Sequence, residues 1–274
     1  MTLRITILGC GSSTGVPRVT NDWGACNPNN PKNRRRRSSL LVERIGPAGR
    51  TTAVIDTSPD FREQFLEAGI LHLDGVLYTH DHADHTHGID DLRTLFYKQR
   101  RRIDLWADQR TLDVLKKRFD YCFQTPEGSS YPAIAEGHII EDYKPVTIGG
   151  LGGDLVFQPF WQIHGDINSL GFRIGGVAFS CDLNDLPPET LPYLRGLDVW
   201  ILNTLRYTEH PSHLSLAKAL AWIDRVKPKQ AILTHMHVDL DYDELAGQLP
   251  AGVTPGFDGM VLEFTDEVLE PARF

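Results

Sequence analysis

The stretch THDHADHTHG (residues 79–88) places four histidines within eight positions. Its spacing H-x-H-x-D-H is informative, because alternate residues of an extended segment point the same way and His80 and His82 can converge on one ion. The turn that follows lets Asp84 and His85 face a second ion. Imidazole and carboxylate are the ligands that borderline and hard divalent metals prefer. Judged alone, a solvated polar loop before a helix explains the same pattern.

Working outward, further histidines and aspartates follow apolar runs that we expect to be strands. Five such runs end at or just before one of these residues: 51–55 before Asp56, 75–79 before His80, 154–160 before His164, 169–181 before Asp182, and 231–234 before His235. Ligands in α/β proteins cluster beyond the carboxyl ends of strands, where rigid backbone lets side chains converge. The repetition favours one shared metal site over chance.

Between these runs the sequence has amphipathic helical segments, so the chain alternates strands and helices. Ser58-Pro59 predicts a helix start as N-cap and first helical residue, followed by Phe61, Phe65 and Leu66 on one face and a stop near Gly69. Further strands are expected at 103–107 and 198–202, a hairpin turn at Gly175-Gly176, one helix carrying Leu112, Leu115, Phe119 and Cys122, and another from Ser215. Residues 21–33 and 124–137 are expected to be loops, the second a loop or lid.

Composition describes an ordinary globular protein. The chain has 274 residues, 41% of them hydrophobic and 23% charged, and no long linker, so we expect a single domain over residues 1–274. It has no run of about 18 apolar residues and no signal peptide, and its four scattered cysteines are typical of reduced thiols; we therefore expect a cytoplasmic protein that contacts no membrane. The net charge of −8 argues against a large nucleic acid as partner.

The ordered set of histidines and aspartates resembles the five metal motifs of the metallo-β-lactamase superfamily. The resemblance implies an α/β fold, an αββα sandwich of two mixed β-sheets flanked by helices. It implies two divalent ions, with manganese and zinc both compatible with the ligands. By the same resemblance His80, His82 and His164 hold the first ion, Asp84, His85 and His235 hold the second, and Asp182 bridges them. Two ions about 3.5–4 Å apart can clamp a phosphoryl group while a bridging hydroxide attacks in line.

A narrower resemblance rests on LGCGSSTGVP, NRRRRSSLLV, IDTSPDF and a histidine 22 residues before the last ligand. These segments are similar to the phosphodiesterase branch that opens phosphoribosyl 1,2-cyclic phosphate. The resemblance makes His213 a catalytic residue beside Asp84, and a pKa near neutrality would suit His213 as a general acid. Asp56 stands where the superfamily has a carboxylate that accepts a hydrogen bond from a ligand imidazole, although a helix-entry role explains it equally well.

The remaining candidates concern the substrate. Ser13 lies in a glycine-rich loop able to offer phosphate contacts, and Asn203, Arg206 and Tyr207 follow a strand and precede His213. Glu209 is a candidate for orienting His213. Arg34–Arg37 can contact phosphate, although we expect at least two of the four to be solvated. The branch carries a cysteine-rich zinc site where this chain has Cys26 alone, so we expect no structural zinc there.

Together these features predict a binuclear-metal phosphodiesterase of a small phosphate diester, either a cyclic ribose phosphate or a nucleotide. A homodimer is the expected oligomeric state. Three alternatives remain open: a ribonuclease Z-like tRNA 3′-processing endonuclease, a thioesterase or lactonase of the same superfamily, and a binding module that has lost activity. The acidic chain shows no insertion resembling the basic arm with which ribonuclease Z grips tRNA.

Overall fold

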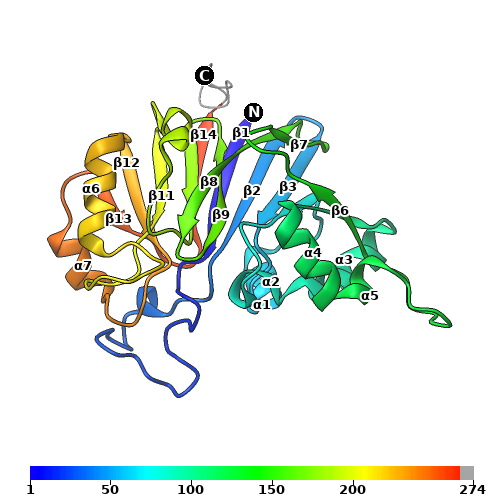
Figure 1. Ribbon diagram of the computed structural model, residues 1–274, viewed down its shortest axis with the longest axis horizontal. Helices are drawn as coiled ribbons and strands as arrows, with labels where there is room; N and C mark the ends of the chain where they lie inside the picture. The colour runs from blue at the N-terminus through cyan, green and yellow to red at the C-terminus, as the bar shows by residue number, and fades with distance from the viewer. Residues whose placement is uncertain (266–274) are drawn as a thin grey trace.

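The expected strands assemble into two mixed sheets in a computed structural model that describes residues 1–265 (Figure 1). The first sheet has the strand order β14 (Met260–Thr265), β1 (Thr2–Gly9), β2 (Ser39–Gly46), β3 (Gly49–Ile55), β4 (Gly75–Leu77), β5 (Ile103–Ala107), β6 (Ala135–Ile139). The four strands from β14 to β3 pair antiparallel, and those from β3 to β6 pair parallel.

The second sheet repeats this plan. Its order is β13 (Val253–Pro255), β12 (Gln230–Thr234), β11 (Val199–Asn203), β10 (Val177–Ser180), β9 (Ile167–Ile174), β8 (Leu155–His164), β7 (Val146–Ile148). Strands β7 to β10 pair antiparallel, and β10 to β13 pair parallel. The hairpin turn between β9 and β10 falls at the predicted Gly175-Gly176.

The sheets bury one face of each strand against the other sheet. In β1 the apolar residues Leu3, Ile5 and Ile7 alternate with polar neighbours and are buried, as the two-residue period of a strand requires. From the second sheet, Phe157 and Phe172 meet at a ring-centroid distance of 6.4 Å and an interplanar angle of 90° within the same core.

Helices cover the outer faces, so the prediction of an αββα sandwich of two mixed sheets is confirmed (Figure 1). On the first sheet lie α1 (Phe61–Ala68), α3 (Leu92–Gln99), α4 (Gln109–Arg118) and α5 (Asp120–Phe123), with the short α2 (Ala83–Thr86) near its edge. On the second lie α6 (Leu216–Val226) and a 3-10 helix at Pro188–Leu194, with α7 (Tyr242–Gln248) beside β13. Among residues 1–265 no helix combines the length and apolar character needed to cross a membrane.

The predicted helix start at Ser58-Pro59 is two residues too early. Helix α1 begins at Phe61 with Asp60 as N-cap, and the Ser58 hydroxyl accepts a hydrogen bond from Asp60 N. The helix ends at Gly69 in the left-handed conformation, as expected. Leu66 is wrongly placed by the sequence, because its side chain is 62% exposed while Phe61 and Phe65 are buried.

Other boundaries also move. The single helix predicted around Leu112 and Cys122 is two helices, because Phe119 leaves helical geometry between α4 and α5. Strand β8 continues through His164, four residues beyond the predicted run. Strand β6 begins at Ala135, so residues 135–137 of the predicted loop 124–137 belong to a strand. The segment 21–33 is a loop, as expected, apart from the 3-10 turn Pro31–Asn33.

We expect the inter-sheet core to dominate stability. Phe172→Ala should lower the free energy of unfolding by about 3–5 kcal/mol, because it removes a fully buried ring and leaves a cavity. The matched change Leu66→Ala, on the exposed face of α1, should stay within about 0.5 kcal/mol of wild type. Urea unfolding followed by circular dichroism measures both; equal losses would contradict this assignment of the core.

Candidate metal centre

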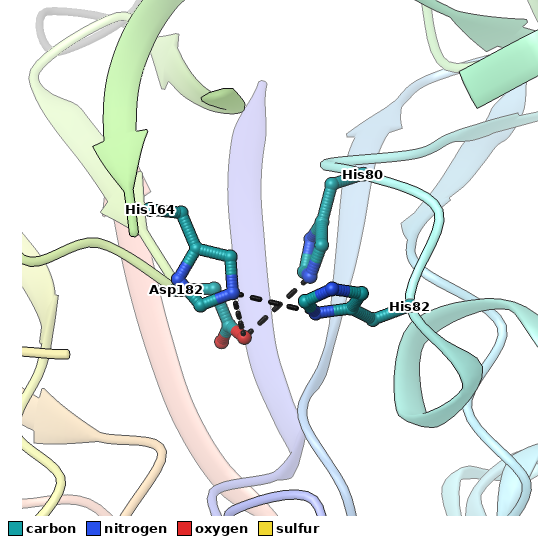
Figure 2. Close-up of side chains that lie close together, drawn as sticks. All are labelled: His80, His82, His164 and Asp182. Carbon is teal, nitrogen blue, oxygen red and sulfur yellow. Dashed lines mark hydrogen bonds and ion pairs between the residues drawn. The ribbon is translucent and has the colours of Figure 1, made fainter. Parts of the chain in front are cut away.

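Four side chains from three separate parts of the chain meet at one edge of the two sheets. His80 and His82 follow β4, His164 ends β8, and Asp182 follows β10. One ligand atom of each lies within 4.8 Å of those of the others, and Figure 2 shows them pointing toward one another. His80, His164 and Asp182 are buried, whereas His82 is exposed, so the cluster opens to solvent at His82.

The carboxylate of Asp182 is the centre of the arrangement. Its Oδ2 lies 3.6 Å from Nε2 of His80, 3.5 Å from Nε2 of His164 and 3.4 Å from Nε2 of His85. His164 Nε2 is also 3.3 Å from Nδ1 of His82. These separations are typical of side chains that share an ion, because ligands about 2.0–2.2 Å from a cation lie a little over 3 Å apart.

In three of the buried histidines, Nδ1 is already hydrogen-bonded. Nδ1 of His85 donates to Oδ2 of Asp56 at 2.7 Å, and Nδ1 of His164 donates to the carbonyl oxygen of Ser212 at 2.7 Å. Nδ1 of His80 lies 2.9 Å from the Thr79 hydroxyl, which itself donates to Asp56. Each hydrogen bond fixes the proton on Nδ1 and leaves the Nε2 lone pair facing Asp182.

Asp56 therefore has the hydrogen bonds expected of a carboxylate behind the ligands. It is fully buried and accepts from the backbone N–H and the hydroxyl of Thr79 as well as from His85. Helix α1 begins five residues later, so Asp56 makes no contribution to its cap.

The residues present fit a cation. Nε2 of His80, Nε2 of His85 and Oδ2 of Asp84 are buried and have no hydrogen-bond partner among the described residues. Buried polar atoms without partners cost free energy, and such a set of lone pairs is the donor set that a divalent ion accepts.

A second group forms around the other oxygen of Asp182. It comprises His85, Cys181, Asp182 and His235. His235 presents Nδ1, 3.0 Å from Asp182 Oδ1, and the thiol of Cys181 lies 3.1 Å from the same oxygen. Asp84, expected in this set, lies beside it with Oδ2 3.3 Å from His85 Nε2. Cys181 was not predicted from the sequence, although it directly precedes a predicted ligand.

Strained backbone marks three of these positions. Asp56, Asp182 and His235 each follow a strand and have φ values of 66°, 31° and 58°. Non-glycine residues rarely adopt this left-handed region, and each such residue costs about 1–3 kcal/mol unless its surroundings impose it. The turn aims each side chain at the cluster.

The pKa values of two neighbouring histidines shift in opposite directions. Burial lowers the pKa of His80 well below its ordinary value, and the adjacent His85 lowers it further. Burial also acts to lower the pKa of His85, but Asp182, Asp84 and Asp56 outweigh it and raise that pKa well above the ordinary value. The carboxylates thus favour positive charge at His85, which a bound cation would supply in place of a proton on its Nε2.

His213 lies against the cluster from the loop between β11 and α6. Its ring is 4.9 Å from His235, nearly parallel at 16°, and 4.8 Å from His164. Burial lowers the pKa of His213 to about 3, so the ring is neutral near pH 7 and the expected pKa near neutrality is wrong. His210, which the sequence analysis passed over, lies 5.1 Å from His213.

Asn203 is a positioning residue rather than the expected substrate contact. It is fully buried, and its Oδ1 accepts from Leu214 N at 3.0 Å. Its amide nitrogen lies 3.4 Å from Nδ1 of His213. Since an amide nitrogen only donates, Nδ1 of neutral His213 accepts and Nε2 carries the proton.

Three other residues of this loop have partners within the protein. Arg206, expected in the substrate pocket, donates to the carbonyl oxygens of Thr208 and Glu209. Tyr207 faces Gln248 of α7. Glu209 does not orient His213: it accepts from Ser215 at 2.9 Å and pairs with Lys218 at 2.7 Å. Local turn geometry, invisible in residue spacing, directs these side chains.

Ser13 and one residue of the arginine run, Arg37, lie near Asp84. Ser13 is exposed and lines a cavity that also contacts Asp84. Of the four arginines, Arg34 is exposed, Arg36 and Arg37 are half-buried, and Arg35 is buried. Their partners differ: Arg35 is buried against the Leu240 and His237 carbonyls, Arg36 pairs with Asp258 and Glu67, and Arg37 pairs with Asp60.

Cys26 has neighbours that explain its burial. Its thiol lies 3.4 Å from the carbonyl oxygens of Val238 and Leu240 and 3.8 Å from Nη1 of Arg35. In this position it links the long β1–β2 segment to the loop after β12.

The chain is similar to known proteins over much of its length. Residues 51–236 match a family described as the beta-lactamase superfamily domain. A protein described as an octanoyltransferase from Porphyromonas gingivalis (strain ATCC BAA-308 / W83) is 36% identical over 261 residues, which cover 94% of this chain and 51% of that protein. The chain thus spans about half the length of this relative.

Solved structures are similar over nearly the whole chain. A crystal structure described as a new diphosphatase from the PhnP family is 36% identical, with a TM-score of 0.86, and the match covers 96% of this chain and 98% of that one. Zn²⁺-bound PqqB from Methylobacterium extorquens has a TM-score of 0.72 at 17% identity, covering 94% of this chain and 99% of that one. At that identity the likeness shows the fold.

We expect the hydrogen bonds of Asn203 to contribute to the free energy of unfolding. Asn203→Ala should lower the free energy of unfolding by about 1–3 kcal/mol, because it leaves the buried Leu214 N–H without an acceptor. Asn184→Ala is the matched control, since Asn184 Oδ1 accepts from Gly165 N at 2.8 Å in a more exposed place and should cost less. Chemical denaturation measures both, and an equal or smaller loss for Asn203→Ala would contradict the assignment.

Proposed function

Because this chain belongs to the beta-lactamase superfamily and is a metal-dependent hydrolase, we propose that it is a phosphodiesterase acting on a small phosphate diester with two divalent ions. The observation that carries the proposal is the convergence of three Nε2 atoms on one carboxylate oxygen of Asp182, with every matching Nδ1 hydrogen-bonded elsewhere.

The ions would divide the cluster between them. His80, His82 and His164 would hold the first, and Asp84, His85 and His235 the second, with Asp182 shared. When bound, such a pair supplies Lewis-acid chemistry that polarises a phosphoryl group and lowers the pKa of water. The nitrogen and oxygen donors suit zinc and manganese, and the thiol of Cys181 beside the second set favours zinc there.

His213 would act on the substrate directly. Its Nε2 carries the proton because Nδ1 faces the Asn203 amide, so the neutral ring can donate to a phosphoryl or leaving-group oxygen. Such a donor contributes where negative charge develops in the transition state. Asn203 and the Ser212 carbonyl fix this loop relative to His164.

The choice of a phosphate ester draws on the relatives. The similar structure at 36% identity is described as a diphosphatase of the PhnP family, and its match spans both chains almost completely. The octanoyltransferase name belongs to a protein of which this chain matches about half. An acyl thioester is therefore the comparison substrate in the test.

The test is a substrate panel with controlled metal. Chelator-treated protein reloaded with Zn²⁺ or Mn²⁺ should hydrolyse bis(p-nitrophenyl) phosphate or adenosine 2′,3′-cyclic phosphate, and the metal-free protein should not. Turnover of S-octanoyl thioester without diester turnover would replace the proposal with a thioesterase. Cleavage of precursor tRNA in preference to small diesters would replace it with a ribonuclease Z-like enzyme.

Asp182→Ala should lose at least one ion per chain, because both groups of candidate ligands include this carboxylate. Elemental analysis after dialysis measures the content, with Asp185→Ala as a nearby control that belongs to neither group. Full occupancy in Asp182→Ala would reject the shared-ligand assignment.

His213→Ala should keep its metal content and lose turnover by about 10²-fold or more, since it removes a donor aimed at the substrate and no proposed ligand. Steady-state kinetics with bis(p-nitrophenyl) phosphate gives the ratio. Unchanged kcat would remove His213 from the catalytic residues.

A further inference from the structure

A cavity beside the candidate metal centre is lined by a tryptophan and two isoleucines. It has a volume of about 910 Å³, and we call it the tryptophan cavity; its lining includes Arg110, Ile139, Ile140 and Trp161. Its walls come from three parts of the chain: the start of α4, the segment 139–144 at the end of β6, and the middle of β8.

The tryptophan cavity lies at the same edge of the sheets as the candidate ligands. Strands β4, β5 and β6 run parallel, so the residues that follow β5 and β6 lie on the edge where His80 follows β4. The two sheets meet there, because the Leu170 N–H donates to the Thr79 carbonyl oxygen at 2.8 Å. Leu170 in turn pairs with Trp161 across β9 and β8. Trp161 therefore lies two strand spacings, about 10 Å, from the peptide that leads into His80.

Arg110 joins the cavity to the segment that carries two candidate ligands. Its Nη2 lies 3.6 Å from Oδ1 of Asp81, the residue between His80 and His82. This Oδ1 is buried and has no hydrogen-bond partner among the described residues, so its attraction to the guanidinium holds Arg110 there. A group bound in the cavity is therefore adjacent to the first set of candidate ligands.

Trp161 presents an aromatic surface that is already fixed in position. Its indole Nε1 donates to Oδ1 of Asp142 at 3.1 Å, and its side chain is half-buried against the inter-sheet core. The remaining part of the ring lines the cavity together with Ile139, whose side chain is 52% exposed. Stacking a flat ring on this surface costs little side-chain entropy in the protein, because the indole is held before the ligand arrives.

The charged side chains of the cavity already have partners among the described residues. Asp108 accepts from backbone N–H groups of α4, Arg110 pairs with Asp81, Asp113 with Gln109, Asp142 with Trp161, and Glu141 with Lys144. The four carboxylates outnumber the two cations, which opposes a phosphate group in this place. The surface left for a ligand is aromatic and aliphatic, so it suits a flat, uncharged ring.

We propose that the tryptophan cavity binds the nucleobase of the substrate by stacking on Trp161. The inference rests on the proposed function and narrows it, because it makes the small phosphate diester a nucleotide rather than a sugar phosphate without a base. With the phosphoryl group at the candidate metal ligands, the ribose spans the distance of about 10 Å to the indole. The base lies between Trp161 and Ile139, away from both candidate ions.

A matched pair of diesters tests the inference. Adenosine 2′,3′-cyclic phosphate and methyl β-D-ribofuranoside 2′,3′-cyclic phosphate differ only in the group at C1′. In metal-loaded wild type we expect adenine to raise kcat/KM by about tenfold or more, because the base stacks on the indole. Trp161→Leu should abolish this advantage while kcat/KM for the methyl riboside stays within about threefold of wild type. Trp161→Phe keeps an aromatic ring and should retain most of the advantage.

Two further variants separate stacking from folding. Ile139→Glu places a charge on an exposed residue of the cavity and should also reduce the advantage. Trp222→Leu is the matched control and should keep it, because Trp222 lies on α6 outside the cavity, against the Arg225 guanidinium. Elemental analysis should give unchanged metal content in every variant. Equal kcat/KM for the two diesters in wild type, or an advantage that both Trp161→Leu and Ile139→Glu retain, overturns the inference.

Binding without turnover separates this inference from the proposed function. Adenosine carries no phosphate, so its titration into chelator-treated protein measures the cavity alone. We expect calorimetry to give one site that Trp161→Leu and Ile139→Glu weaken by about tenfold and Trp222→Leu keeps. If wild type hydrolyses neither diester but binds adenosine in this way, the proposed function fails and the cavity is a nucleoside site. Absence of adenosine binding overturns the inference, and hydrolysis of both diesters at equal rates then leaves the proposed function standing.

Discussion

One carboxylate oxygen, Oδ2 of Asp182, lies opposite three imidazole nitrogens whose partner nitrogens are already committed. Because each Nδ1 is hydrogen-bonded elsewhere, each Nε2 is the ring nitrogen left to bind a ligand. A histidine with a free Nδ1 could turn its ring or exchange tautomers, but His85 and His164 are fixed by a carboxylate and by a backbone carbonyl. Their lone pairs therefore face a buried anion that cannot donate a proton to them. A cation is the group that satisfies all of these atoms together.

Strained backbone conformations place several of the side chains at the cluster. Asp56 and His235 occupy left-handed conformations directly after strands β3 and β12, and Asp182 does so two residues after the end of β10. A strand end packed on both faces cannot relax, so the sheet supplies the rigidity that holds such turns. The repeated plan of the two sheets explains why the ligands gather at one edge, since β8 and β10 both run antiparallel to β9 and end on the same side.

The sequence predicted the residues at strand ends well and the side chains on loops poorly. Apolar runs ending in His or Asp located the strand ends, and the strand ends located the cluster. Side chains on the loop after β11 were misjudged, because Asn203 and Glu209 choose partners through turn geometry that spacing does not encode. Cys181 was missed for a related reason: it follows an apolar strand, and its thiol lies beside the Asp182 carboxylate at the left-handed turn where that strand ends.

The charge of the chain must be considered locally. A net charge of −8 opposes a long polyanion, yet the segment between β1 and β2 concentrates arginines beside the candidate ligands. Buried Arg35, bonded to the Leu240 and His237 carbonyls, ties this segment to the loop after β12. These arginines thus belong to a loop that is anchored beside the candidate ligands but lies outside the sheets. Changes in that loop can alter the charge next to the site without moving the strand ends that carry the candidate ligands.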